Sequence, residues 1–308
     1  MVSRSTLIGA LVVVELALVG LMARALTGSG QASTFAGAGT PWWSSGHSHE
    51  VVPFSASLTT GPAPHVVIDA PRYRVTVVAQ SGDDVRISGS TFVHGIVHGS
   101  PAPVSLERTT DGVRISAPDQ AVNVVFGEVV RELHVTLPPQ STIEATGAGR
   151  LSVSGLRAKL LARLDNAALS VSDHRGEIEA SSANGRIELR NVAGERIAVS
   201  TSNGRLSLDD VAGPLLDVHT ANGRITAAGL RVTDGRITSG NGHIKVTFDD
   251  ASDTTVTATS GNGPVSCSGA STSSDGGRTR VVTLGSGKGR FTISSGNGPV
   301  TITQGAHA

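Results

Sequence analysis

The stretch Asn184-Gly185-Arg186-Ile187-Glu188-Leu189 is a clear copy of a phrase that recurs along the C-terminal half of the chain. The phrase consists of Asn-Gly, then a basic or small residue, then an apolar-x-apolar triplet. Later copies begin at Asn203, Asn222, Asn241, Asn262 and Asn297, so successive copies are 19, 19, 19, 21 and 35 residues apart. A period this regular is typical of a repeat protein in which each unit packs on the next.

Each period also contains a second turn signal near its middle, as in Asn191 to Gly194, followed by a second apolar alternation. Two short strands and two turns of about 19 residues in all can close one flattened coil. Stacking such coils at about 4.8 Å would align equivalent residues. The sequence therefore predicts an all-β fold, a repetitive β-solenoid (β-helix-like or β-roll-like) with coils of about 19 residues. The predicted inner row is Ile187, Leu206, Ile225, Ile244, Val265 and Val300.

Asn-Gly is also the strongest short signal for a two-residue β-hairpin, which would make the same region an antiparallel meander. The near-constant period favours stacking, because hairpins do not need equal lengths. In a solenoid the asparagines would lie above one another at one corner, adopt positive φ and hydrogen-bond to their neighbours. Asn and Gly are then residues of the fold and not of a ligand site.

Composition supports an all-β chain and narrows the function classes. The 308 residues include 38 Gly and only 3% aromatic residues. The 25 basic and 25 acidic residues balance, so we expect no nucleic-acid partner. The single cysteine, Cys267, cannot form an intramolecular disulfide, and we expect a small buried residue there. No pattern indicates a metal site or a cofactor.

The N-terminus predicts export. Residues 7–22 are almost entirely apolar, with Glu15 as the only charge, and residues 23–25 fit a small-x-small cleavage pattern. Residues 1–26 are therefore a signal anchor, with one hydrophobic helix, or a cleaved signal peptide, and residues 27–50 are a flexible linker. We expect a single-pass protein of the cell membrane with its β domain outside the cytoplasm, or a secreted protein if the signal is cleaved.

The β region divides by regularity. Residues 51–146 form an irregular series of strand-length apolar alternations, with hairpin-type turns expected at residues 81–84 and 109–112. Residues 147–304 contain the regular repeats.

A family resemblance follows from two of these features. The phrase LHVTLP at residues 133–138, followed by the NGRI and NGPV repeats, resembles the adhesin-like β-strand-repeat domain family of bacteria, whose function is unknown. The resemblance covers about residues 65–304. It implies a repetitive all-β domain that is commonly exported or membrane-attached, and it supplies no catalytic residues.

Arg186, Arg205 and Arg224 follow Asn-Gly in three consecutive copies, so stacking would place them about 5 Å apart along one edge. Such a row favours an anionic ligand, such as an envelope polymer, a lipid headgroup or an acidic glycan. The alternative is a charged edge that only prevents aggregation. Proline replaces this arginine in the last two copies, so the row should weaken toward the C-terminus.

The sequence predicts a noncatalytic, membrane-anchored, extracytoplasmic scaffold for adhesion or for contact with proteins or envelope polymers. One alternative is an envelope-sensing or regulatory partner of another membrane protein, contacted through residues 7–22. A second is a solenoid polysaccharide hydrolase or lyase, for which Glu177 and Glu179 are paired carboxylates on one strand. No residue is predicted to be catalytic.

Overall fold

The computed structural model describes residues 49–98, 104–117, 123–268, 272–275 and 277–305. Throughout these ranges the chain forms 23 β-strands and no helix, so the predicted all-β class is confirmed. None of the described segments is a helix able to cross a membrane. The predicted hydrophobic helix at residues 7–22 and nearly all of the predicted linker lie outside the described residues.

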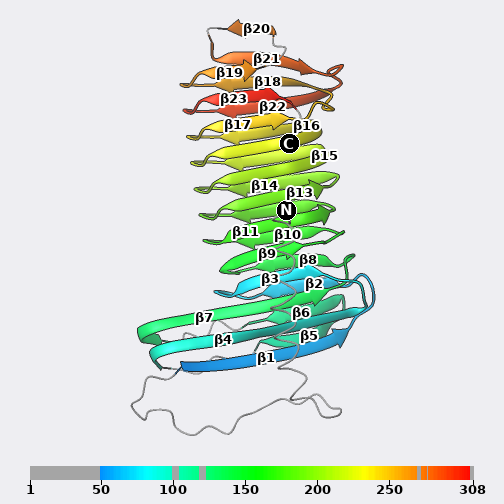
Figure 1. Cartoon of the computed structure of the whole chain (residues 1–308), viewed down its shortest axis with the longest axis vertical. Helices are drawn as coiled ribbons and strands as arrows, with labels where there is room; N and C mark the ends of the chain where they lie inside the picture. The colour runs from blue at the N-terminus through cyan, green and yellow to red at the C-terminus, as the bar shows by residue number, and fades with distance from the viewer. Residues whose placement is uncertain (1–48, 99–103, 118–122, 269–271, 276, 306–308) are drawn as a thin grey trace, which may run out of the picture. The chain divides into compact units, whose positions relative to one another are not determined.

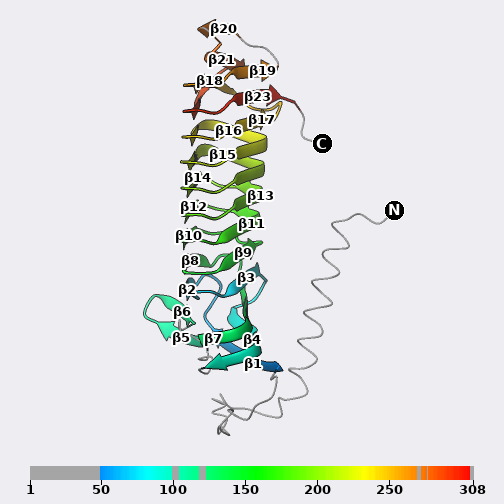
Figure 2. The same cartoon turned by 90° about the vertical axis from the view of Figure 1, so that its left-hand side faces the viewer.

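The strands stack in parallel as two back-to-back rows, seen side by side in Figure 2. In stacking order, row A comprises β6 (Gly112–Ser116), β2 (His65–Asp69), β8 (Thr142–Thr146), β10 (Leu160–Leu164), β12 (Ile178–Ser182), β14 (Arg196–Thr201), the second halves of β15 (Leu206–Thr220) and β16 (Ile225–Ser239), β22 (Gly289–Ser295) and β18 (Thr254–Ser260). Row B comprises β7 (Asn123–Leu137), β3 (Arg74–Ala79), β9 (Arg150–Ser154), β11 (Ala168–Arg175), β13 (Ile187–Ala193), the first halves of β15 and β16, β17 (Ile244–Phe248), β23 (Val300–Gln304) and β19 (Val265–Ser268).

Antiparallel strands extend the rows at their ends (Figure 1). Beyond β7 lie β4 (Asp84–His98) and β1 (His49–Thr59), and beyond β6 lies β5 (Ser105–Thr109). Beyond β18 lie β21 (Thr279–Leu284) and β20 (Thr272–Asp275).

The regular part is a β-solenoid with 19-residue coils, as predicted, and not an antiparallel meander. Ile187 lies opposite Leu206, Leu206 opposite Ile225, and Ile225 opposite Ile244, always between parallel strands. All members of the predicted inner row are at most 3% exposed. Because alternate side chains of each strand face inward, both rows contribute to one continuous core, in which each buried aliphatic side chain adds about 1.5 to 3 kcal/mol.

The order of the layers departs from the order of the sequence at both ends of the stack. The coil β2–β3 lies between the coils β6–β7 and β8–β9. At the other end, β22–β23 lies between β16–β17 and β18–β19. The strands β2, β3, β6, β7, β8 and β9 thus stack in the same two rows as the regular repeats.

Of the two hairpins expected from the sequence, the strand pairing shows one and excludes the other. Thr109 lies opposite Gly112 in the antiparallel pair β5–β6, so the hairpin at residues 109–112 is confirmed. The hairpin expected at residues 81–84 is wrong. The strand β7 pairs with β3 on one side and with β4 on the other, so this turn joins two strands that are not neighbours.

Candidate binding surface

We call the turn between each row A strand and the next row B strand the asparagine corner. Here the side-chain amides form a continuous ladder, in which each Nδ2 donates to the Oδ1 of the asparagine in the preceding layer at 2.5 to 2.8 Å. The ladder runs through Asn166, Asn184, Asn203, Asn222, Asn241, Asn297 and Asn262. The predicted stacking of asparagines is confirmed, with the last two in reversed order.

The predicted positive φ of these asparagines is wrong. The described non-glycine residues with positive φ are Arg72, Asp173, Asn191 and Asp210, and none is a member of the ladder. The corner glycines are required by close approach instead. A Cβ atom on Gly204 would lie 1.8 Å from the carbonyl oxygen of Gly185 in the preceding coil.

A second ladder, of buried hydroxyl groups, lies inside the asparagine corner. Thr201 Oγ1 donates to the carbonyl of Gly185 at 3.3 Å, and Ser239 Oγ to that of Gly223 at 3.0 Å. These hydroxyls give the corner carbonyls a hydrogen-bond donor inside the stack. Sequence reasoning missed this ladder, although Ser or Thr precedes the asparagine by two positions in every copy. The members are Ser182, Thr201, Thr220, Ser239, Ser260 and Ser295.

At the opposite corner the chain bends from row B toward row A within or near the end of the row B strand, and this bend needs a left-handed residue. Successive layers place Asp173, Asn191 and Asp210 there, with φ of 53°, 50° and 56°. Asp and Asn tolerate this conformation better than other non-glycine residues. Asn191 Nδ2 also donates to Asp173 Oδ1 at 2.5 Å, which ties two coils together.

The predicted arginine row lies directly beside the asparagine ladder. The carbonyl of Arg205 accepts from Ile187 N and that of Arg224 from Leu206 N, both at 3.0 Å, so the arginines occupy consecutive layers. Arg186, Arg205 and Arg224 are all exposed. His243 continues the row in the next layer, and Pro299 follows it, so the basic character ends there.

Ion pairing leaves the row only partly neutralised. Glu188 accepts from Arg186 at 3.3 Å and lies 3.6 Å from Arg190. Arg205 and Arg224 form no ion pair with any residue in the described ranges. The structure adds Arg150 to the same column, separated from Arg186 by the layer of Ala168. The phrase Gly149-Arg150-Leu151, a degenerate copy of the repeat, was the signal for it.

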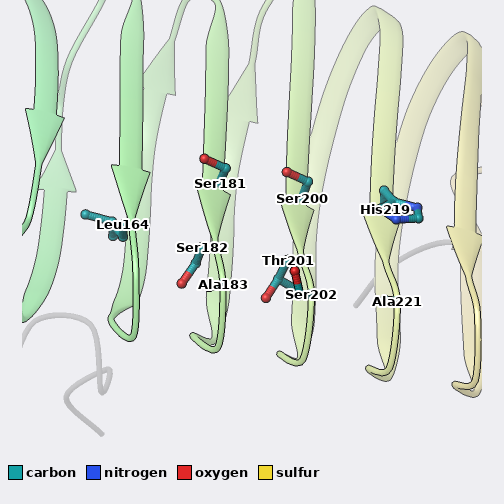
Figure 3. Close-up of a pocket in the computed structure, with 9 residues that line it drawn as sticks. All are labelled: Leu164, Ser181, Ser182, Ala183, Ser200, Thr201, Ser202, His219 and Ala221. Atoms are coloured by element: carbon teal, nitrogen blue, oxygen red, sulfur yellow. The ribbon is translucent and has the colours of Figure 1, made fainter.

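A shallow depression of about 270 Å³ lies on the face of row A beside the asparagine corner (Figure 3). Ser181, Ser200 and His219 follow one another on neighbouring strands, and Leu164 together with small or hydroxyl-bearing residues supplies the rest of the lining. No carboxylate lines it. His219 Nδ1 lies 2.8 Å from Thr238 Oγ1, a hydroxyl of the next layer. The depression therefore lacks the pair of carboxylates that a glycoside hydrolase needs.

The carboxylates considered for polysaccharide cleavage are engaged in ion pairs. Glu177 lies 3.2 Å from Lys159, and Arg163 bridges Glu144 at 3.7 Å and Glu179 at 3.9 Å. These pairs join neighbouring layers on the face of row A. Their geometry supports a role in stacking more than one in acid–base chemistry.

Cys267 lies opposite Ile302 in β23, at an inward-facing position of the repeat, but the predicted full burial is not found. It is only half-buried, because β19 ends row B. Burial raises the pKa of its thiol.

Comparisons with solved structures find similar chains of low identity. They include a proposed adhesin from Bacteroides fragilis NCTC 9343 (13% identity, TM-score 0.49, 82% of this chain and 97% of that one). A proposed adhesin from Parabacteroides merdae ATCC 43184 gives 12% identity, a TM-score of 0.47 and coverage of 83% and 96%. A proposed lipid-binding protein from Parabacteroides distasonis ATCC 8503 has 10% sequence identity and a TM-score of 0.45, and the match covers 82% of this chain and 96% of that one.

The sequence comparisons give a sharper result. A comparison with curated proteins finds no match. The family model described as Toastrack DUF4097 matches residues 67–304, which is nearly the whole range of the stacked coils and of the family resemblance seen in the sequence. The chain belongs to the Toastrack DUF4097 family.

Proposed function

We propose that this protein is a noncatalytic, extracytoplasmic scaffold that contacts a linear anionic polymer of the cell envelope through its arginine row. The observation that carries the proposal is the registered column of Arg186, Arg205 and Arg224. Two guanidinium groups about 5 Å apart repel each other by about 0.8 kcal/mol in water, and an anion lying along them relieves this repulsion. The apolar segment at residues 7–22 supports the extracytoplasmic location.

The position of the row favours a ligand over protection against aggregation. Charged residues protect a sheet when they lie on an edge strand with unpaired backbone groups. In this stack the backbone of each interior strand is hydrogen-bonded to the layers on both sides. The open sheet edges lie at the ends of the stack, and the arginines lie along a corner between them. A purely protective role does not explain charges at that place.

The test compares two triple variants of the full chain that remove equal charge. One carries Arg186→Gln, Arg205→Gln and Arg224→Gln. The matched control carries Arg196→Gln, Arg236→Gln and Arg290→Gln, which are exposed residues of row A. Binding to beads that carry linear polyphosphate should weaken about tenfold in the first variant, at roughly 0.5 kcal/mol per lost contact, and should change little in the control.

Added salt should reduce the binding of the parent chain, because the contacts are exposed. Equal losses in the two triple variants would show that only net charge matters. Binding that neither variant nor salt changes would contradict the proposal.

A further inference from the structure

The coil β22–β23, at residues 289–304, is the last described coil in the sequence but not the last layer of the stack. Its strand β22 is paired with β16 on one side and with β18 on the other. Its strand β23 is likewise paired with β17 and β19. We call the space between the flanking layers, residues 235–248 and 254–268, the slot.

The slot makes specific contacts with this coil. Phe291 packs edge-to-face on Phe248, with ring centroids 5.3 Å apart, and both side chains are fully buried. Asp234 Oδ1 accepts from Arg290 N at 2.7 Å. Thr303 Oγ1 lies 2.8 Å from Thr247 Oγ1. These groups add to the asparagine ladder, which passes through the coil.

One short connection, residues 285–288, ties this coil to the described strands that precede it, and no described strand of the stack follows it. Gly285 and Gly287 have φ of 59° and 70°, so the connection turns sharply at two points. An element joined to its domain through a single short connection can be exchanged between two identical chains.

Asp253 holds this connection in place. Ser286 Oγ donates to both of its carboxylate oxygens, at 2.9 and 3.0 Å, and Lys288 N donates to Oδ1 at 3.3 Å. Lys288 Nζ lies 3.6 Å from Oδ2. The hydrogen bond from Ser286 lowers the pKa of this carboxyl group. Asp253 belongs to the turn at residues 249–253, which crosses the layer of the inserted coil to reach β18.

The neighbouring coil can close the empty slot. Residues 260–265 and 295–300 both read Ser-Gly-Asn-Gly-Pro-Val, so the two coils offer the same ladder groups. When residues 289–304 are withdrawn, residues 254–268 can stack directly on residues 235–248. The withdrawn state then keeps most of its corner hydrogen bonds, which lowers the cost of exchange.

We propose that the slot also accepts residues 289–304 of a second copy of the chain, so that two copies exchange this coil and form a domain-swapped dimer. The partner is identical in sequence, so its coil can make with the slot the same contacts that the coil makes within one chain. Asp253 limits the exchange, because its bonds to the connection must break first.

The experiment uses full-length chains purified in mild detergent, with Cys267→Ser as the common background. One chain carries Lys245→Cys and the other Thr301→Cys, at positions that are register partners in β17 and β23. Adjacent strands are close enough for a disulfide. The two chains are mixed at high concentration, incubated and oxidised. We expect a mixed disulfide dimer, and Asp253→Asn in both chains should make it form several-fold faster.

Two controls define the result. A chain with Lys245→Cys and Thr301→Cys together should close the disulfide within one molecule, and failure to do so would disprove the register itself. A mixed pair with Ser207→Cys and Thr226→Cys tests register partners in β15 and β16, which lie in the middle of the stack. If the first pair gives no more mixed dimer than this second pair, with and without Asp253→Asn, coil exchange is disproved.

Discussion

At the asparagine corner the coils lie so close together that only glycine fits at the position after the asparagine in each Asn-Gly copy. Gly204, Gly223 and Gly242 each lie under 2 Å, measured from an ideal Cβ, from a carbonyl oxygen of the preceding coil. The obstructing atom belongs to the backbone, so a side chain cannot move aside to make room.

Gly204→Ala should therefore reduce the free energy of unfolding by about 3 kcal/mol, measured by urea denaturation. The matched control is Gly305→Ala, where nothing lies within 4 Å of the new Cβ and the stability should not change. A loss below about 1 kcal/mol for Gly204→Ala would mean that the coils separate easily at this corner.

His174 is an exception within the core. It lies opposite Val192 and has no exposed surface, and neither ring nitrogen has a hydrogen bond of ordinary length and angle among the described residues, although the backbone of Gly176 and Glu177 lies nearby. Burial lowers its pKa from 6.5 to about 4. The folded protein thus keeps this imidazole neutral at pH values where the unfolded chain protonates it.

Above pH 6.5 the neutral form is present in both states, and the protein has its full stability. As the pH falls from 6.5 toward 4, the free energy of unfolding decreases by up to about 3 kcal/mol. His174→Leu should remove this loss. The difference in unfolding free energy between variant and parent should grow as the pH falls from 7.5 to 4.5. Parallel pH curves for the two proteins would contradict the assignment.

At the scale of the element, each asparagine corner inside the ladder is bonded to the layers on both sides, and the two end members are bonded on one side. Asn203 donates to Asn184 and accepts from Asn222, whereas Asn262 takes part in one ladder bond, with Asn297. A hydrogen bond contributes roughly 1 kcal/mol net. Asn203→Ala should therefore cost about 2 kcal/mol and Asn262→Ala about 1 kcal/mol in the same denaturation assay. Equal costs would show that the ladder is not the source of the stability.

The repeat phrase predicted the strands well in the part of the stack where consecutive repeats lie in adjacent layers. The two strands per period and the inward row follow from local alternation, which is a property of sequence. The same reasoning mispredicted a hairpin at residues 81–84. The strand β7, which comes much later in the sequence, lies between β3 and β4 and pairs with both. The conformation of the corner asparagines was also mispredicted, since Asn-Gly here serves close stacking instead of a hairpin.

At the scale of the whole stack, the same kind of layer-crossing turn occurs near both ends. Near each end a turn crosses one layer to reach the layer beyond it, at residues 138–141 and 249–253. Each turn contains a fully or almost fully buried serine: Ser141 bonds to the carbonyl of Pro138 and Ser252 to that of Leu230, both at 2.7 Å. The last described coil, β22–β23, is thereby enclosed, and antiparallel strands cover the ends of the stack, as the ends of a repeat stack require.

The candidate surface was only partly readable from the sequence. The arginine column was predictable, because residues at the same position in stacked repeats of equal length must lie above one another. The pairing of Glu188 with Arg186 depends on side-chain positions that the period does not determine. The same holds for Arg205 and Arg224, which form no ion pair with a described residue.

The sequence by itself determined the strand class, the 19-residue coil, the buried row and the columns of Asn and Arg, because each depends only on local alternation and equal spacing. Only the tertiary structure decided which coil lies on which. Every copy of the phrase offers the same ladder of Asn, Gly and Ser or Thr, so these hydrogen bonds cannot distinguish one neighbour from another. The order at the C-terminal end is decided by unique contacts, namely Phe291 on Phe248 and Ser286 on Asp253, between residues distant in the chain.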